Sequence, residues 1–160
     1  MKKLILFPVL LFLLLLPACR AKTYRNDLAP EDLAQTCAEA IGMEDPIYEN
    51  AEVLRNVSTS FEKRPDATVC YTANGGNLDE FCIWRTDNDD VGTVVSFLNA
   101  YLGETLENNR AYYDSYIPEE TPKLRDAEVR VYGSYAVYAV LSPEARKTFF
   151  ATVESALTPA

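Results

Sequence analysis

Apolar residues return every three or four positions in three stretches of the chain, which predicts three amphipathic helices. The first begins at Pro30, carries acidic residues in its first turn and stops at Gly42. The second runs from about Asp90 to Tyr113, and the third follows the cap Ser142-Pro143-Glu144. The residues expected to face the core are Leu33, Cys37, Ala40 and Ile41 in the first helix, Val91, Val94, Val95, Leu98, Tyr101, Leu102 and Leu106 in the second, and Ala145, Phe149, Val153 and Leu157 in the third.

Two other stretches are rich in β-branched and aromatic residues and predict β-hairpins. Thr68 to Thr86 turns at Asn74-Gly75-Gly76-Asn77, and Ala127 to Leu141 turns at Gly133-Ser134, where a leading glycine suits a type II′ turn. Residues 43–66 give conflicting signals, and no element is assigned to them. We therefore expect an α+β fold, with an antiparallel sheet of about four strands (two hairpins) packed against two or three helices.

The loop of the first hairpin sets which residues face one another. A three-residue loop from Gly75 to Asn77 gives the pairs Val69–Ile83, Tyr71–Phe81 and Cys70–Cys82. Cys70 and Cys82 would then lie directly opposite each other, on the face away from the other two pairs. A cross-strand disulfide is one expectation, and two reduced, half-buried thiols are the alternative.

The first eighteen residues have the order of a secretory signal peptide. Lys2 and Lys3 precede an apolar run that ends at Leu16, and this run is shorter than the roughly 20 residues of a membrane-spanning helix. Leu16-Pro17-Ala18-Cys19 resembles the lipobox of bacterial lipoproteins, which implies cleavage before Cys19 and acylation of that cysteine. Ordinary signal peptidase cleavage after Ala18 or Ala21 is the alternative.

This organisation predicts three parts, a lipoprotein signal peptide (1–18), a lipid-anchored tether (19–29) and a single domain (30–160). The tether contains Arg20, Lys22 and Arg25, whose side chains can meet anionic lipid headgroups. We therefore expect the chain to reach its membrane through the N-terminal lipid.

The charge balance changes when the signal peptide is removed. Two lysines leave with it, so 15 basic and 24 acidic residues become 13 and 24, a net charge of −11. An acidic surface repels nucleic acid and anionic wall polymers and tolerates cations and basic partners. We expect no nucleic-acid partner.

The chain offers little for catalysis. It contains no histidine, and so lacks the commonest general base and the commonest zinc ligand. Cys37 lies on the apolar face of a predicted helix, where a core role is expected rather than a nucleophilic one. Asp79 and Glu80 are the candidate pair for a carboxylate-based hydrolase, although adjacent strand residues point to opposite faces. We expect no enzyme, cofactor or metal site.

The acidic run before the long helix has two interpretations. Asp87, Asp89 and Gly92 fit places one, three and six of a calcium-binding EF-hand loop. Val91 and Leu98, however, fall where that loop needs oxygen ligands. Capping of the following helix is the better interpretation.

Tyrosines gather near the end of the long helix, at Tyr112, Tyr113 and Tyr116, just before Pro118. Such a cluster can form an aromatic ligand surface for a sugar or a peptide. Packing of the three rings over the edge of the sheet is the alternative.

Four features in this order resemble an uncharacterised family of Gram-positive lipoproteins that carry a domain of unknown function. They are the segment Gly76 to Trp84 (GNLDEFCIW), the long helix, Tyr116-Ile117-Pro118 and the Gly133-Ser134-Tyr135 hairpin. The resemblance covers about residues 65–157 and implies a surface location without any established activity. We expect a lipoprotein on the extracytoplasmic face of the cell membrane that binds an envelope protein or a small ligand. A small carboxylate-based envelope hydrolase is the alternative.

Overall fold

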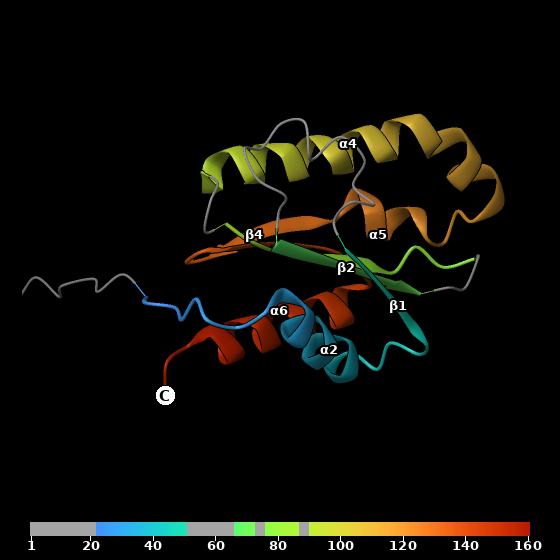
Figure 1. Ribbon diagram of the computed structural model, residues 1–160. Helices are drawn as coiled ribbons and strands as arrows, with labels where there is room; N and C mark the ends of the chain where they lie inside the picture. Colours follow the sequence, from blue (N-terminus) through green and yellow to red (C-terminus); the bar gives the residue numbers. More distant parts are fainter. Residues whose placement is uncertain (1–21, 51–65, 73–75, 87–89) are drawn as a thin grey trace, which may run out of the picture.

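The computed structural model describes residues 22–50, 66–72, 76–86 and 90–160, which form one antiparallel sheet with helices on both faces (Figure 1). The strands are β1 (Pro46–Asn50), β2 (Asp66–Thr72), β3 (Glu80–Arg85), β4 (Glu128–Tyr132) and β5 (Tyr135–Val140). The helices are α2 (Pro30–Ala40), α4 (Val91–Tyr116), α5 (Thr121–Arg125) and α6 (Pro143–Leu157). The α+β class predicted from the sequence is confirmed.

The five strands lie in the order β1-β2-β3-β5-β4, and each neighbouring pair is antiparallel. Both predicted hairpins form, β2 with β3 and β4 with β5. Gly133 has a φ of 60° and Ser134 has no positive φ, as a type II′ turn requires. β1 arises from the stretch left unassigned, so the sheet has one strand more than the four expected. Residues 51–65 of that stretch lie outside the described part of the chain.

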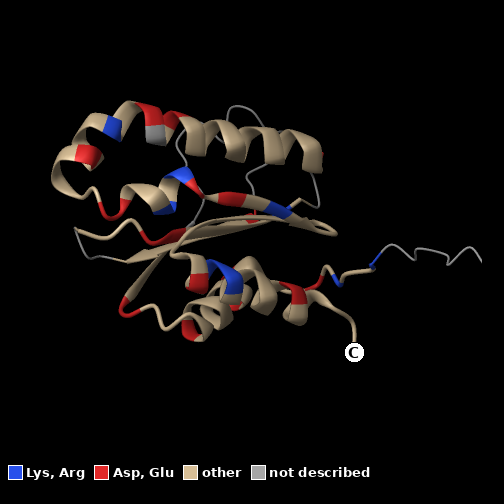
Figure 2. Cartoon of the chain, turned by 180° about the vertical axis from the view of Figure 1, so that it is seen from behind, with Lys and Arg blue, Asp and Glu red and all other residues tan. Residues whose placement is uncertain are grey.

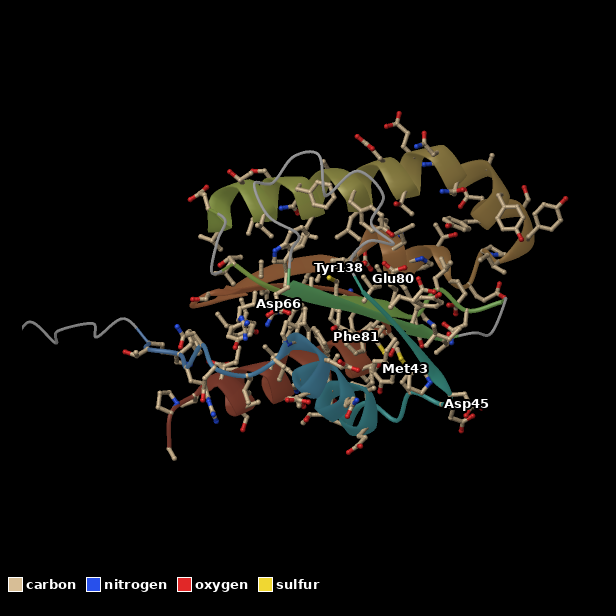
Figure 3. The ribbon with its side chains drawn as sticks, viewed as in Figure 1. Met43, Asp45, Asp66, Glu80, Phe81 and Tyr138 are labelled. Atoms are coloured by element: carbon tan, nitrogen blue, oxygen red, sulfur yellow. The ribbon has the colours of Figure 1, made fainter. Side chains whose placement is uncertain are left out.

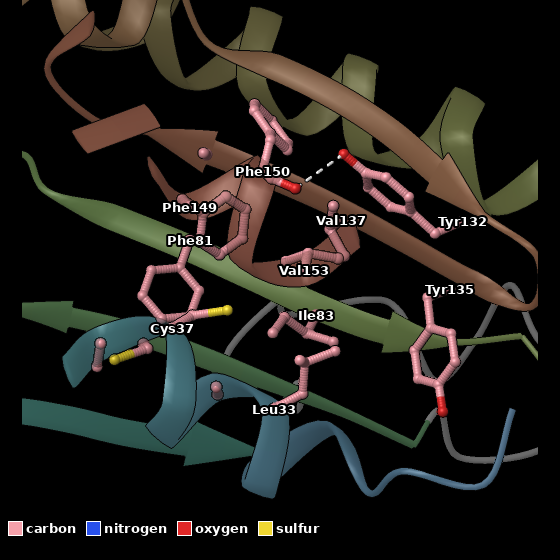
Figure 4. Packing of buried hydrophobic residues seen from close by; sticks show 14 of the residues in the cluster. Leu33, Cys37, Phe81, Ile83, Tyr132, Tyr135, Val137, Phe149, Phe150 and Val153 are labelled. Carbon is pink, nitrogen blue, oxygen red and sulfur yellow. Dashed lines mark hydrogen bonds between the residues drawn. The ribbon is translucent and has the colours of Figure 1, made fainter. Parts of the chain in front are cut away.

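α2 and α6 pack together under one face of the sheet and enclose an apolar cluster (Figure 4). The rings of Phe81 on β3 and Phe149 on α6 lie 4.8 Å apart. Burying a side chain of this size contributes roughly 1.5–3 kcal/mol. One predicted core position was wrong: Ala40 is exposed, because this face of α2 instead buries Ala34 and Ala38.

α4 covers the opposite face of the sheet, and the short α5 follows it back toward β4 (Figure 1). The apolar side of α4 packs on Trp84 of β3 and Tyr138 of β5, which are both fully buried. The buried residues of α4 are Val94, Leu98 and Leu102, as predicted. The side chain of Leu106 lies outside the described part of the structure.

Side-chain caps fix the starts of the two long helices. The Asp90 carboxylate accepts a hydrogen bond from the Thr93 amide at 2.9 Å, and the Ser142 hydroxyl accepts one from the Ala145 amide at 3.3 Å. Caps of this kind stabilise a helix by about 1 kcal/mol. Asp90 thus acts as the predicted cap, while residues 87–89 are not described.

The predicted register of the first hairpin is wrong by one residue. The structure pairs Val69 with Cys82, Cys70 with Phe81 and Tyr71 with Glu80. A one-residue shift turns a strand over relative to its partner. Cys70 therefore belongs to the cluster under α2 and α6, and Cys82 to the cluster under α4. The predicted Cys70–Cys82 pair does not form, and both residues are separate, buried thiols.

The described residues before α2 lie against the domain instead of standing away from it. The ring of Tyr24 meets that of Tyr132 edge to face at 5.5 Å, and Leu28 packs on the cluster under α2 and α6. The Arg25 amide donates to the Leu157 carbonyl at 2.8 Å. The described part of the expected tether of residues 19–29, from Lys22 onward, thus packs against the folded unit.

The two ends of the sheet differ in what surrounds them. Asp66, Arg85 and Tyr135 lie at one end, together with the segment 22–28 and the C-terminus of α6, and we call it the N-terminal end. At the other, which we call the open end, Thr72 closes β2 and Glu80 begins β3. α4 runs along the sheet from the first to the second (Figure 1). Among the described helices, none combines the length and apolar character needed to cross a membrane.

Candidate functional site

The open end carries a pocket of about 440 Å³. Its walls are the loop 41–45 after α2, the residues Thr72, Asn77 and Asp79 of the first hairpin, and Leu141 with Ala145 beside α6. Met43 and Asp45 lie at this end in Figure 3, opposite the end marked by Asp66. The pocket thus joins three segments that are far apart in the sequence.

The loop that shapes the pocket uses unusual backbone angles. Gly42 has a φ of 64° directly after the cap of α2, and Asp45 has a φ of 46° just before β1. Left-handed angles cost little for glycine and more for other residues, although aspartate tolerates them better than most. Met43 turns inward, where its sulfur lies 3.6 Å from the Cys70 sulfur. The loop is therefore held by a glycine turn and a partly buried methionine.

One polar group in the pocket wall lacks a partner. The Thr72 hydroxyl oxygen is shielded from solvent and has no hydrogen bond to any described residue. Buried hydroxyls in folded proteins nearly always have a partner, so an exception at a pocket wall marks a place for a ligand group or a water. The other polar groups around it are the carboxylates of Glu44, Asp45 and Asp79 and the amide of Asn77.

A lysine network joins two residues of the pocket wall, Asn77 and Asp79, to α5. The Lys123 amine lies 2.7 Å from the Asp79 carboxylate and 2.8 Å from that of Glu120, and it donates to Asn77 at 3.2 Å. Glu120 also accepts from the Leu78 amide at 2.9 Å. Burial lowers the pKa of Lys123, but its bonds to Asp79 and Glu120 outweigh that effect and raise the pKa overall. Lys123 thus stays charged and fixes the hairpin to α5.

A second polar cluster lies between the sheet and α4. The Glu80 carboxylate accepts hydrogen bonds from the hydroxyl of Tyr138 and, at 3.4 Å, from that of Tyr101 (Figure 3). Burial raises the pKa of Glu80, while the two hydrogen bonds act in the opposite direction. The charge of Glu80 also raises the pKa of both tyrosines, after the larger effect of burial. This cluster is a partly buried carboxyl held by phenol groups.

The carboxyls of Asp79 and Glu80 do not act on one point. Asp79 pairs with Lys123 beside the pocket, whereas Glu80 lies on the α4 face with the tyrosines. The expectation that these neighbours point to different places is confirmed. Within the described residues, no group of three carboxylate or thiol side chains is arranged to hold a metal ion.

The tyrosines at the end of α4 form an exposed aromatic surface. Tyr116 and Tyr112 are 72% and 56% exposed, and their rings lie 4.9 Å apart at an angle of 32°. Tyr113 turns inward and is only partly exposed. Two of the three predicted rings thus face solvent in mutual contact, and the third packs against the core, as the alternative required. The pair lies where α4 reaches the open end.

The predicted site residues have different surroundings. Cys37, Cys70 and Cys82 are buried thiols. Burial raises the pKa of Cys37 and of Cys70 to about 12, which removes nucleophilic character and agrees with a core role for Cys37. Cys19 lies outside the described residues. The sequence did not reveal Thr72 or the loop 41–45 as parts of a pocket, and only Gly42, the predicted stop of the first helix, indicated a turn there.

Comparison of the chain with protein-family models, with curated proteins and with solved structures finds no match. Its function has to be inferred from its own residues and geometry.

Proposed function

We propose that this chain is a lipid-anchored, extracytoplasmic binding protein that takes a small ligand, or the exposed end of a protein partner, at the open end of its sheet. The observation that carries the binding role is the Thr72 hydroxyl in the wall of the 440 Å³ pocket, which has no hydrogen-bond partner among the described residues. Pockets that hold small ligands commonly combine apolar walls with a few fixed polar groups. Here Leu141 and Ala145 supply the first and the hairpin residues the second.

The charges around the pocket favour a ligand with a basic group. Glu44 and Asp45 line it, and acidic residues occur in both helical layers and in the loops (Figure 2). The net charge of −11 on the chain without its first eighteen residues, from 13 basic and 24 acidic side chains, acts in the same direction over longer distances. An amine, a basic amino acid or a basic peptide end therefore suits this site better than a phosphate or an anionic polymer.

The membrane location is supported by the first nineteen residues. Their positive start, short apolar run and Leu16-Pro17-Ala18-Cys19 motif suit export and acylation of Cys19. The resemblance to Gram-positive lipoproteins points to the same surface. Two acyl chains would give a stable anchor, because a single chain binds a membrane only weakly.

The alternative, a carboxylate-based hydrolase, has less support. Hydrolysis of a sugar bond needs two carboxyls flanking one bond. Asp79 is engaged by Lys123, and Glu80 is turned toward Tyr138 on the other side of the sheet. The pocket therefore suits binding better than acid-base chemistry.

The test is the melting temperature of the chain from residue 20 onward, measured against basic amino acids, polyamines, basic peptides, wall sugars and calcium. A ligand at one hundred times its dissociation constant stabilises the folded state by about 2.7 kcal/mol, which raises the melting temperature by several degrees. We expect such a shift with a basic ligand. Equal melting in every solution would contradict a small-ligand site.

A matched pair of variants assigns the shift to the pocket. Thr72→Val removes the wall hydroxyl, and Ser155→Ala removes an exposed hydroxyl on the outer face of α6. We expect the first to abolish or strongly reduce the ligand-induced shift and the second to leave it intact. A shift that survives Thr72→Val would mean that the ligand binds elsewhere.

A further inference from the structure

We propose that the lipid anchor holds this domain in one orientation, with the N-terminal end of the sheet on the bilayer and the open end projecting into the solution. This inference rests on the proposed acylation of Cys19. It adds that residues Lys22 to Leu28 are not a flexible tether but pack against the domain. We call this segment the strap.

The strap is fixed to the domain by contacts of several kinds. Lys22 forms an ion pair with Glu154, and Tyr24 packs edge to face on Tyr132. The Arg25 amide donates to the Leu157 carbonyl at 2.8 Å. These contacts join the strap to β4 and to the last turns of α6.

The end of the strap nearest α2 is bound to the sheet itself. The Leu28 carbonyl accepts hydrogen bonds from the Tyr135 hydroxyl at 2.8 Å and from the Arg85 guanidinium at 3.2 Å. Tyr135 is fully buried. A Cβ added at Gly133 would lie 3.2 Å from the Cβ of Tyr24, so the backbone of the strap runs close over the turn between β4 and β5. The strap is therefore attached along its whole length.

The covalent distance to the lipid is short. Three peptide units separate Cys19 from Lys22, and they cannot span more than roughly 11 Å in any conformation. The point at which the domain is fixed must stay within that distance of the acylated cysteine. A free tether of residues 19–29 would reach about three times as far. The docked strap thus brings the N-terminal end of the sheet to the headgroups.

The opposite end must then face away from the bilayer. α4 begins near the N-terminal end and ends beside the open end, and its 26 residues make it about 39 Å long. The pocket, Asp45 and the ring pair of Tyr112 and Tyr116 all lie at the far end (Figures 1 and 3). They are placed for a partner that arrives from the solution rather than for a lipid of the same membrane.

The strap also explains why basic residues near the anchor do not need lipid partners. Lys22 already pairs with Glu154, and Arg25 pairs with Asp27 at 2.6 Å. Their charges are therefore largely balanced within the domain. The orientation follows from the docked chain, and it should not depend on anionic lipid.

The experiment uses the full acylated chain in vesicles of neutral phosphatidylcholine that contain a small fraction of a headgroup-linked contact quencher. A fluorophore is attached at Ser155→Cys near the N-terminal end or at Glu119→Cys at the open end. Both positions are exposed, and Cys37, Cys70 and Cys82 are buried and protected from the label. We expect quenching several times stronger at position 155 than at position 119.

Release of the strap gives the decisive comparison. The double variant Lys22→Ser/Tyr24→Ala removes the ion pair and the ring contact but keeps the hydrogen bonds of Arg25 and Leu28. It lengthens the free part of the chain after Cys19 and should clearly reduce the difference in quenching between the two positions while the chain stays on the vesicles. Tyr112→Ala removes a tyrosine at the open end and should leave the difference unchanged. Circular dichroism and the melting temperature of each variant show that the fold persists.

The outcomes separate the two proposals. A chain that does not sediment with the vesicles contradicts the lipid anchor and the orientation with it. A chain that sediments but is quenched equally at both positions in its unaltered form contradicts the orientation alone. A difference of unchanged size in the double variant also overturns the inference, because docking of the strap next to the anchor would not be its cause.

Discussion

The two ends of the sheet differ in how completely other segments cover them. At the N-terminal end the strap lies over the turn at Gly133, and its Leu28 carbonyl accepts hydrogen bonds from the side chains of Tyr135 and Arg85. At the open end the covering segments leave a pocket, and the Thr72 hydroxyl has no described partner.

The contrast between the two ends indicates that the N-terminal end contributes stability and the open end contributes binding. Contacts in which both groups have a partner stabilise the fold. A pocket wall with a polar group that has no described partner adds no stability until a ligand or a water binds there. Within the open end, Lys123 forms a stabilising contact of the first kind, because it pairs with both Asp79 and Glu120. Substitutions should therefore have effects that depend on whether they touch such a contact or the pocket wall.

The largest effect is expected for Lys123→Met, which leaves two partly buried carboxylates facing each other without their cation. Removing one partner of a fully buried ion pair costs about 3–5 kcal/mol, and partial solvent access should reduce this to about 2 kcal/mol. Arg125→Met on the same helix removes only an exposed pair with Asp126 and should leave the stability nearly unchanged. Urea unfolding measures both. Equal losses of unfolding free energy in the two variants would mean that the Lys123 network does not stabilise the fold.

Tyr24→Ala should come next, because it removes the ring that fixes the strap to Tyr132. Truncating a fully buried ring to alanine lowers the unfolding free energy by about 3–5 kcal/mol, and truncating the half-buried Tyr24 should lower it by about 1–2 kcal/mol. Limited proteolysis should also show faster cleavage before α2. Tyr116→Ala, at an exposed ring, is the control and should be nearly neutral. An unchanged melting temperature in Tyr24→Ala would contradict docking of the strap.

A smaller, pH-dependent effect is expected for Glu80→Gln. Because burial raises the pKa of Glu80, the folded state binds its proton more tightly, so stability falls as the pH rises from the unfolded value of about 4.3 through the folded one. The glutamine side chain can still accept a hydrogen bond but carries no charge. We expect the variant to lose less stability than the unaltered chain as the pH rises above the unfolded value of about 4.3.

The absence of histidine makes that measurement clear, since few other side chains titrate between pH 5 and 8. Glu128→Gln, which alters a partly exposed carboxylate on β4, is the control and should keep the original pH slope. If Glu80→Gln and the unaltered chain show parallel melting curves across this range, burial does not disfavour the charged form of Glu80.

The smallest effect on stability is expected for Thr72→Val at the pocket wall. Its hydroxyl has no partner in the described structure, so removal should change the unfolding free energy by less than about 0.5 kcal/mol. Loss of ligand binding with unchanged stability would set the open end apart from the N-terminal end. A loss of about 2 kcal/mol or more, on the scale of a buried hydrogen-bonded group, would show that the hydroxyl is structurally engaged.

The sequence predicted the helices and hairpins because their signals are local. Helical spacing, the caps Asp90 and Ser142, and the glycine turn at Gly133 each act within a few residues. The register of β2 and β3 could not be obtained in this way. Both faces of β3 are covered by helices, so its apolar run Phe81 to Trp84 does not distinguish the faces.

The candidate site depended on contacts that the sequence cannot show. The pocket joins the loop 41–45 to the hairpin and to Leu141, and the strap joins residues 22–28 to the turn after β4. The tyrosines were found because they are close in sequence, and their exposure depended on how α4 sits on the sheet. Local chemistry was predictable, whereas long-range assembly was not.

The central claim is that this domain is held on a membrane through acylated Cys19, and the mass of the N-terminal peptide of the mature chain tests it most directly. The protein is extracted from membranes of an expressing cell and digested, and its first peptide is analysed. We expect a peptide that begins at Cys19 and carries the added mass of acyl chains, and that is absent after Cys19→Ala. An unmodified peptide that begins at Cys19 or Lys22, or a chain that retains its first eighteen residues, would contradict it.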